Sequence, residues 1–336
     1  MADPQAELKL FRPKHEFFVG IDSDGCAFDT MEVKHKFCFV TAVMQAFGLA
    51  ALARTLRDVW DFVNLSSRSR GCNRWHALRA TMEHLVELTP YERFKPFLAA
   101  HLDVIKDFLA TSEKDKRIQL SNEGLLLYTE LKLHIPAAQV LAKGIVADAV
   151  GVSTSPMGRA IVQADTSPDA CLLRLLYWTH VVNGLVGLYV YDVPPFPHCR
   201  KSLEKLAPVA DIICVSATPY EALAREWEEH GISRHAAVIC GQEQGKKETH
   251  LALAAKGKYP PHRILMIGDA PGDLKAARLN NALFFPVNPG AEDRSWQLFL
   301  DEAANRFLSE TYAGDYEAAL IKEFDKHLPS TPPWKQ

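Results

Sequence analysis

Residues 17–25 of this 336-residue chain read FFVGIDSDG. Five apolar or small residues are followed at once by two carboxylates, Asp22 and Asp24, and a glycine. A short apolar run bounded by turn residues is typical of a buried strand. Two carboxylates just past such a strand can divide catalytic work, because one can attack an electrophile while the other handles a proton. The alternative is a turn that only ends the strand, since Asp and Gly are common there.

Four more short apolar runs follow further along the chain. The expected strands span residues 17–22, 212–216, 236–240, 264–269 and 282–287. Helical patterns separate the later runs, at residues 219–230, 247–256 and 272–279. This alternation predicts an α/β fold whose parallel sheet is covered by helices on both faces. Ligands of such sheets bind at the carboxyl ends of the strands, so we expect Asp22, Ser216 and Asp269 to meet there.

The first expected strand ends at residue 22 and the second begins at residue 212. That gap is far too long for a loop in a compact domain. Its sequence is helix-like nearly throughout, and the Pro-rich stretch VPPFP, residues 193–197, leads the chain back. We therefore predict a discontinuous core domain at residues 1–30 and 193–336, with a large helical domain inserted at residues 31–192.

Further candidate site residues follow two of the later strands. The stretch GDAPGD, residues 268–273, puts Asp269 and Asp273 where a helix begins, so both carboxylates can face a hard cation such as Mg²⁺. The same residues also suit an ordinary helix start. Ser216 closes an apolar run, where its hydroxyl and the following amides can hold a phosphate oxygen. Thr218 begins a capping-box pattern, TPYE, and is assigned to helix capping.

A lysine doublet, Lys246 and Lys247, precedes the helical pattern at residues 247–256. One ammonium aimed at the carboxylates would stabilise both a nucleophile and the charge of a phosphoryl group. The alternative is a solvated pair, the common fate of such doublets. Counting back from the helix favours Lys247 over Lys246 only by a small margin, so both remain candidates.

These motifs occur in a recognisable order: D-x-D-G, then Ser, then Lys, then G-D-x-x-x-D. The set closely resembles the four motifs of the haloacid dehalogenase (HAD) superfamily, over residues 17–30 and about 196–287. Residues 22–30, DSDGCAFDT, resemble the D-x-D-G-x-x-x-D-[ST] form of its β-phosphoglucomutase and phosphoglycolate-phosphatase branch. Two departures are Cys26, where that branch usually has Thr or Val, and the absence of a Lys-Pro pair at the lysine motif.

The resemblance implies a fold, a cofactor and residue roles. The fold would be a Rossmann-like core with the helical insertion as a C1-type cap. Asp22 would be the nucleophile and Asp24 the general acid and base, as in phosphoryl transfer. The cofactor would be Mg²⁺, bound by Asp22, the backbone carbonyl of Asp24 and Asp269, with Asp273 in support.

The insertion also carries a candidate for substrate recognition. Residues 64–74, NLSSRSRGCNR, contain three arginines around a glycine. Guanidinium groups suit a second phosphate or a carboxylate on a substrate. The candidate substrate-binding residues are Arg68, Arg70, Asn73 and Arg74. A solvated loop is the alternative, because charged loops usually form ordinary surface.

Composition narrows the classes of partner. A net charge of −3 gives no large field for nucleic acid or an anionic membrane, so a small molecule is expected. Seven cysteines without a C-x-x-C pair favour a reducing compartment, and the first residues lack the apolar run of a secretory signal, so we expect a cytoplasmic protein. The apolar stretch at residues 172–191 is interrupted by Arg174, His180 and Asn183, which favours a buried helix over a membrane span.

The sequence therefore predicts an enzyme: a magnesium-dependent phosphatase that hydrolyses a small phosphorylated metabolite through an aspartyl-phosphate intermediate. A sugar phosphomutase acting at the same site is one alternative, because the sequence does not indicate whether the closed site excludes water. A catalytically inactive binding protein on the same fold is the other.

Overall fold

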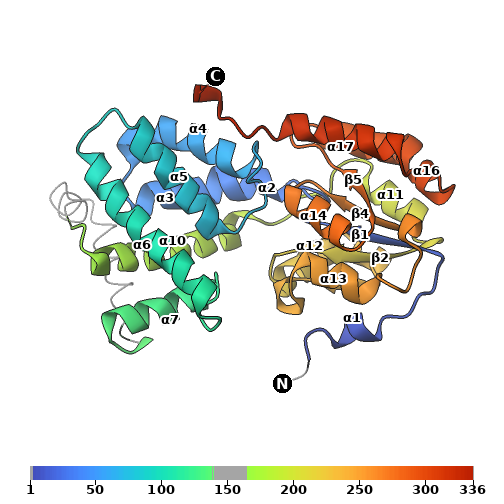
Figure 1. Cartoon of the computed structure of the whole chain (residues 1–336), viewed down its shortest axis with the longest axis horizontal. Coiled ribbons are helices and arrows are strands. Elements are labelled where there is room, and N and C mark those ends of the chain that lie inside the picture. Colours follow the sequence, from blue (N-terminus) through green and yellow to red (C-terminus); the bar gives the residue numbers. More distant parts are fainter. Residues whose placement is uncertain (1–2, 138, 140–164, 336) are drawn as a thin grey trace. The chain divides into compact units, whose positions relative to one another are not determined.

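The computed structural model describes residues 3–137, 139 and 165–335 (Figure 1). The chain divides into two compact units. The first unit comprises Met1–Glu32, Ser66–Gly71 and Tyr191–Gln336, and the second comprises Val33–Leu65 and Cys72–Val190. Part of the predicted insertion, residues 138 and 140–164, lies outside the described residues.

The first unit is built on a five-stranded parallel sheet with strand order β3-β2-β1-β4-β5 (Figure 1). Its strands are β1 (Phe17–Ile21), β2 (Ala210–Val215), β3 (Val238–Cys240), β4 (Ile264–Gly268) and β5 (Leu283–Pro286). Each corresponds to one of the expected strands, so the predicted α/β fold with a parallel sheet is confirmed. The chain runs outward from β1 to β3 and then returns to the other side of β1 for β4 and β5.

Helices pack on both faces of this sheet. The helices of the first unit are α1 (Ala6–Leu10), α2 (Thr30–Val33), α11 (Cys199–Leu206), α12 (Tyr220–Glu229), α13 (Lys247–Ala254), α14 (Pro271–Leu279), α15 (Glu292–Leu298), α16 (Ala304–Leu308) and α17 (Asp315–His327). Alternate residues of β1 enter opposite cores, as expected when side chains point to the two faces in turn. Val19 packs with residues of α11, α12, α15 and α16, whereas Phe18 packs with residues of α1, α13, α14 and α17.

The described part of the second unit is helical. Its helices are α3 (Val40–Ala46), α4 (Ala53–Asn64), α5 (Arg74–Leu88), α6 (Phe94–Lys114), α7 (Asn122–Leu133) and α10 (Pro168–Tyr189), and a π-helical segment, Lys34–Phe39, precedes α3. Local sequence explains several helix starts, since Ser121 and Ser167 accept hydrogen bonds from the amides of Gly124 and Ala170. Three fully buried tryptophans, Trp60, Trp75 and Trp178, lie in this unit.

Among the described helices, α10 is long and apolar enough to cross a membrane by length and composition, but half of its most apolar window is buried inside the protein. Core helices of soluble proteins often share that length and composition. Arg174, in the first third of α10, is buried and donates hydrogen bonds to His101 and to the carbonyl of Asp165. The first half of α10 is therefore buried as expected, whereas its last turn is exposed, with Leu188 and Tyr189 more than half accessible.

The main difference from the predicted domain boundaries concerns a short segment. Residues Ser66–Gly71, placed in the insertion from the sequence, belong to the first unit. Gly71 lies so close to the first unit that a Cβ added there would be 2.8 Å from Cβ of Ala270, and its backbone φ is +73°. Only glycine adopts that conformation at little cost. The segment carries Arg68 and Arg70, so both arginines belong to the unit that holds the sheet.

Candidate active site

The carboxyl ends of β1, β2 and β4 bring three polar residues to one edge of the sheet. Ile21 pairs with Cys214 of β2 and with Ile267 of β4. Asp22 is the residue after Ile21, and Ser216 and Asp269 are each two residues past its partners. The expected convergence of Asp22, Ser216 and Asp269 is therefore a consequence of the register, with β1 between the strands that carry the other two.

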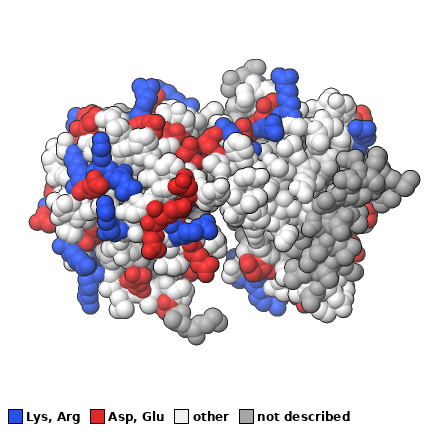
Figure 2. Space-filling view, turned by 180° about the vertical axis from the view of Figure 1, so that it is seen from behind, with Lys and Arg blue, Asp and Glu red and all other residues white. Residues whose placement is uncertain are grey.

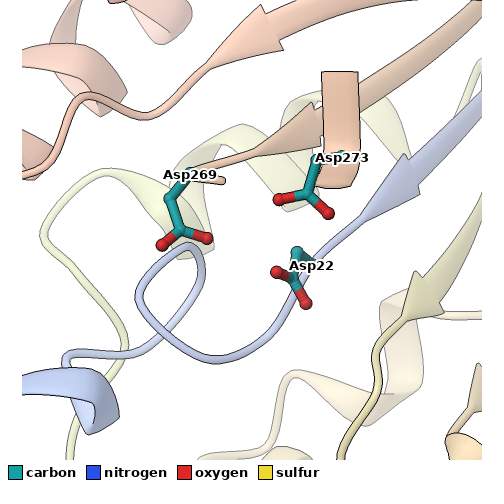
Figure 3. A group of neighbouring side chains, drawn as sticks. All are labelled: Asp22, Asp269 and Asp273. Carbon is teal, nitrogen blue, oxygen red and sulfur yellow. The ribbon is translucent and has the colours of Figure 1, made fainter. Parts of the chain in front are cut away.

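Three aspartates gather at this edge. Asp22 follows β1, Asp269 follows β4, and Asp273 lies in the first turn of α14 (Figure 3). One carboxylate oxygen from each lies within 4.8 Å of the others, and all three residues are buried. Buried carboxylates this close repel one another unless cations compensate them.

Lys247 supplies one of these cations. Its Nζ atom, at the start of α13, lies 2.5 Å from Oδ2 of Asp22 and 2.6 Å from Oδ1 of Asp273. Lys246 is the N-cap residue of the same helix, and in the described part of the chain no hydrogen bond or ion pair joins its side chain to the three aspartates. The geometry therefore selects Lys247 from the doublet that the sequence left open.

Arg70 supplies the second cation, which the sequence did not predict at this place. Its Nε atom donates to Oδ2 of Asp269 over 2.6 Å, and both side chains are almost fully buried. The other oxygen of Asp269, Oδ1, is buried and has no hydrogen-bond partner. Gly25 permits this close packing, because a Cβ there would lie 2.5 Å from Nη2 of Arg70.

Burial controls the electrostatics of the cluster. Burial, together with neighbouring carboxylates, raises the pKa of Asp22 and of Asp269, and the cations Lys247 and Arg70 oppose these shifts. Burial lowers the pKa of Lys247, but its ion pairs with Asp22 and Asp273 outweigh that effect, so its pKa is raised. Lys247 is therefore charged at neutral pH, and an additional cation would favour the ionised form of Asp22.

The donor set fits a hard divalent cation. Mg²⁺ prefers oxygen ligands and is bound through a few carboxylates. The three aspartates provide such oxygens, and the unpartnered Oδ1 of Asp269 is the kind of buried atom that a metal would satisfy. With all three carboxylates ionised, the two cations leave one net negative charge in the cluster. The residues that would hold the metal are Asp22, Asp269 and Asp273.

Asp24 lies apart from this acidic group and is held by hydroxyls. Thr30 donates to its Oδ1 and Thr218 to its Oδ2, the latter over 2.7 Å. The assignment of Thr218 to helix capping is wrong, because the N-cap of α12 is Pro219 and the first amide of the helix, that of Tyr220, donates to the side chain of Glu243. The carboxylate of Asp24 is the stronger acceptor for this hydroxyl. Metal binding by the backbone carbonyl of Asp24 stays a prediction.

Two buried tryptophans fix the loop after β1. Trp227 of α12 donates to Oγ of Ser23 over 3.0 Å, and Trp296 of α15 donates to the carbonyl of Cys26 over 2.8 Å. Both rings belong to the core on one face of the sheet. Cys26, where the HAD branch has Thr or Val, is buried, and burial raises the pKa of its thiol well above the usual value.

Ser216 is buried at the end of β2, and its hydroxyl accepts a hydrogen bond from the amide of Thr218 over 3.2 Å. A hydroxyl that accepts in this way still has a hydrogen to donate. Ser216 can therefore hold an anionic oxygen beside Asp22.

The four candidate substrate-binding residues lie in different surroundings. Arg68 is half exposed and pairs with Asp325 of α17 at 3.0 Å. Asn73 caps α5 by accepting from the amide of Trp75, and Arg74 lies over the ring of Phe39. Within the described residues, Arg70 is the member of the four that is bonded to the acidic group. Their role in substrate binding stays a prediction.

The surface drawn in Figure 2 shows Lys and Arg interspersed with Asp and Glu, which agrees with the small net charge. No protein-family model and no curated protein sequence matches this chain. Inferences about its function therefore depend on the geometry of the site and on the motif resemblance.

Proposed function

We propose that this protein is a magnesium-dependent phosphatase of the HAD superfamily that hydrolyses a small phosphorylated metabolite. The observation that carries the proposal is the arrangement at the end of β1: Asp22 bonded to Lys247 within the acidic group, and Asp24 held separately two residues later. A nucleophile and a proton-transfer group in different environments are what two-step phosphoryl transfer needs.

In the first step, an oxygen of Asp22 attacks phosphorus and the bond from phosphorus to the leaving-group oxygen breaks. The leaving-group oxygen keeps the electron pair and takes a proton from the carboxyl of Asp24. In the second step, Asp24 accepts a proton from water as the water oxygen attacks phosphorus, which releases phosphate and regenerates Asp22. Asp24 is half-buried, so it can meet both the leaving group and water.

Other residues would bind the phosphoryl group and orient the nucleophile. Lys247 holds Oδ2 of Asp22, and the amide of Ser23 donates to Oδ1 over 2.8 Å, so the carboxylate has a fixed direction. Ser216 would donate to a phosphoryl oxygen from the β2 side. Mg²⁺ bound by Asp22, Asp269 and Asp273 would neutralise phosphoryl charge and orient the group for in-line attack.

Within this proposal, the helical second unit would act as a C1-type cap that shapes the substrate site. The substrate is a small anion, so the proposal needs neither a nucleic-acid nor a membrane partner. A cytoplasmic location fits the unpaired cysteines Cys26, Cys38, Cys72, Cys171, Cys199, Cys214 and Cys240.

The direct test is release of inorganic phosphate from p-nitrophenyl phosphate in the presence of Mg²⁺. Asp22→Asn keeps the shape of the nucleophile but removes its charge, so kcat/KM should fall at least about a thousandfold, or about 4 kcal/mol of barrier. The matched control is Asp29→Asn, an exposed aspartate in the same motif. If Asp22→Asn keeps more than a tenth of the activity, Asp22 is not the nucleophile.

The metal requirement forms a second arm of the same test. EDTA should abolish phosphate release and added Mg²⁺ should restore it. Ca²⁺ should support little turnover, because its coordination is larger and looser. Full activity after exhaustive chelation would exclude the proposed mechanism.

A further inference from the structure

Asp24 is held by hydroxyl groups from two different elements. Thr30, the first residue of α2, donates to one carboxylate oxygen, and Thr218, between β2 and α12, donates to the other over 2.7 Å. Donors on both oxygens fix the rotation of the carboxylate as well as its position.

Thr218 is well placed to define that position because its own backbone is fixed. Its amide donates to Oγ of Ser216 over 3.2 Å, and its carbonyl accepts from the amide of Gln242 over 3.1 Å. A Cβ at Gly241 would lie 2.7 Å from the same carbonyl, so the turn after β3 packs closely against it. The hydroxyl therefore projects from a rigid turn.

The sheet order gives this contact a direction. β1 lies between β2 and β4. Asp269 and Asp273 follow β4, whereas Thr218 follows β2. The bond to Thr218 thus ties Asp24 to the side of Asp22 that carries Ser216, away from the carboxylates that would bind a metal.

We propose that Thr218 is a positioning residue, which holds Asp24 where it gives its proton to the leaving-group oxygen of phosphate esters with poor leaving groups. This inference rests on the proposed phosphatase function. When the bond from phosphorus to the leaving-group oxygen breaks, an alkoxide keeps the electron pair and needs the Asp24 proton. A nitrophenolate carries the pair without one, so its departure depends far less on Asp24.

The experiment uses three substrates of similar shape: p-nitrophenyl, phenyl and benzyl phosphate, in order of increasingly poor leaving group. In Thr218→Val, which keeps the shape but lacks the hydroxyl, the ratio of kcat/KM for p-nitrophenyl phosphate to that for benzyl phosphate should rise at least about tenfold. The loss of kcat/KM for phenyl phosphate should lie between the losses for the other two substrates. Thr218→Ser, which keeps the hydroxyl, should return the ratio to near its wild-type value.

Both rates in each ratio come from one preparation, so a partly unfolded variant does not change the ratio. If Thr218→Val lowers kcat/KM equally for all three substrates, or changes it for none, the proposal for Thr218 is overturned while the phosphatase function stands. The proposal is also overturned if Thr218→Val raises the ratio further in an Asp24→Ala background, because Thr218 would then act through another group. If wild-type protein hydrolyses none of the three with Mg²⁺, the proposed function itself fails.

Discussion

At the residue scale, Arg70 is the position where sequence and structure assign different surroundings to one side chain. The sequence places its segment in a recognition loop of the insertion, yet its Nε atom lies 2.6 Å from Asp269. Two effects on metal binding then compete. Arg70 can orient Asp269, which is typically worth 10–100-fold in metal affinity. As a cation bonded to a ligand residue, it would also repel a bound dication, by about 7 kcal/mol at a separation of roughly 5 Å and an effective dielectric constant of 20.

Because the repulsion is the larger effect, we expect Arg70→Met to bind Mn²⁺ more tightly than the wild type. The variant removes one positive charge from the cluster and keeps a long apolar stem. Free Mn²⁺ measured by electron paramagnetic resonance, without substrate, gives the affinity directly. We expect the dissociation constant to fall at least about tenfold.

Arg68→Met is the matched control, because Arg68 lies in the same segment but pairs with Asp325 at the surface. Its Mn²⁺ affinity should stay within about twofold of the wild type, since exposed ion pairs contribute little. Weaker binding by Arg70→Met would show instead that orientation of Asp269 dominates.

Individual side chains limited what the sequence could predict about the site. Asp22, Asp269 and Asp273 were predictable together because strand ends and a helix start fix their places. The partners of Asp24 were not, because TPYE satisfies a capping pattern equally well, and only the tertiary fold brings Asp24 within reach of Thr218. Likewise, nothing in residues 64–74 indicates that Arg70 packs against Asp269.

At the element scale, β2 is held in place by a carboxylate near its amino-terminal end, which is the end of the strand opposite the candidate site. Oδ2 of Asp211, the second residue of β2, accepts from the amides of Lys14 and His15 and from the hydroxyl of Tyr259, all within 2.9 Å. Burial raises the pKa of Asp211, but these hydrogen bonds outweigh burial and hold its pKa below the usual value. The carboxylate ties the chain before β1 to β2.

The sign of the pH dependence follows from that shift. A depressed pKa in the folded state means that the unfolded chain binds the proton first as the pH falls. The contribution of Asp211 is therefore present above about pH 4, near its usual pKa. This contribution to stability is lost as the pH drops through the lower pKa that Asp211 has in the folded state.

We expect Asp211→Asn to lower the free energy of unfolding by about 1–3 kcal/mol at pH 7, because two amides and a hydroxyl lose a charged acceptor. The difference from wild type should shrink as the pH falls below about 4. Urea unfolding at a series of pH values measures both. Asp3→Asn, at an exposed ion pair with Lys9, should change little at any pH. A difference that stays constant with pH would contradict the role of the charge.

Elements were the scale at which the sequence was most informative. β4 and the helices α13 and α14 begin within one residue of the expected positions, because Gly, Pro and Asp mark their ends. The helix-like start of the insertion instead includes the π-helical segment Lys34–Phe39. Apolar periodicity does not distinguish an i to i+5 hydrogen-bond pattern from the usual one over so short a stretch.

At the scale of the whole molecule, the chain contains two units with their own interiors. The first is discontinuous, and it includes Ser66–Gly71, a segment within the predicted insertion. The sequence predicted an insertion because the gap between strands is so long. It could not predict that this short segment returns to the first unit, because polar residues carry no periodic pattern that shows which surface they contact.

The division into two units makes a prediction about metal and stability. A ligand that binds only the folded state stabilises the unit that holds its site, by about 2.7 kcal/mol at a hundred times the dissociation constant. The acidic group belongs to the first unit. In calorimetry of the full chain, two unfolding transitions are expected. Saturating Mg²⁺ should raise the midpoint temperature of one transition by about 5–10 °C and change that of the other by no more than about 1 °C.

The variant Asp269→Asn separates metal binding from general salt effects, because it removes one ligand charge without emptying the core. It should abolish the shift produced by Mg²⁺ while keeping two transitions.

His101→Gln identifies the transition of the second unit, since His101 is buried there and burial lowers its pKa to about 4. Protonation of His101 in the unfolded state between pH 6.5 and pH 4 destabilises that unit as the pH falls, and the variant should lose this part of the pH dependence. A single transition that Mg²⁺ raises as a whole would mean that the two units unfold as one.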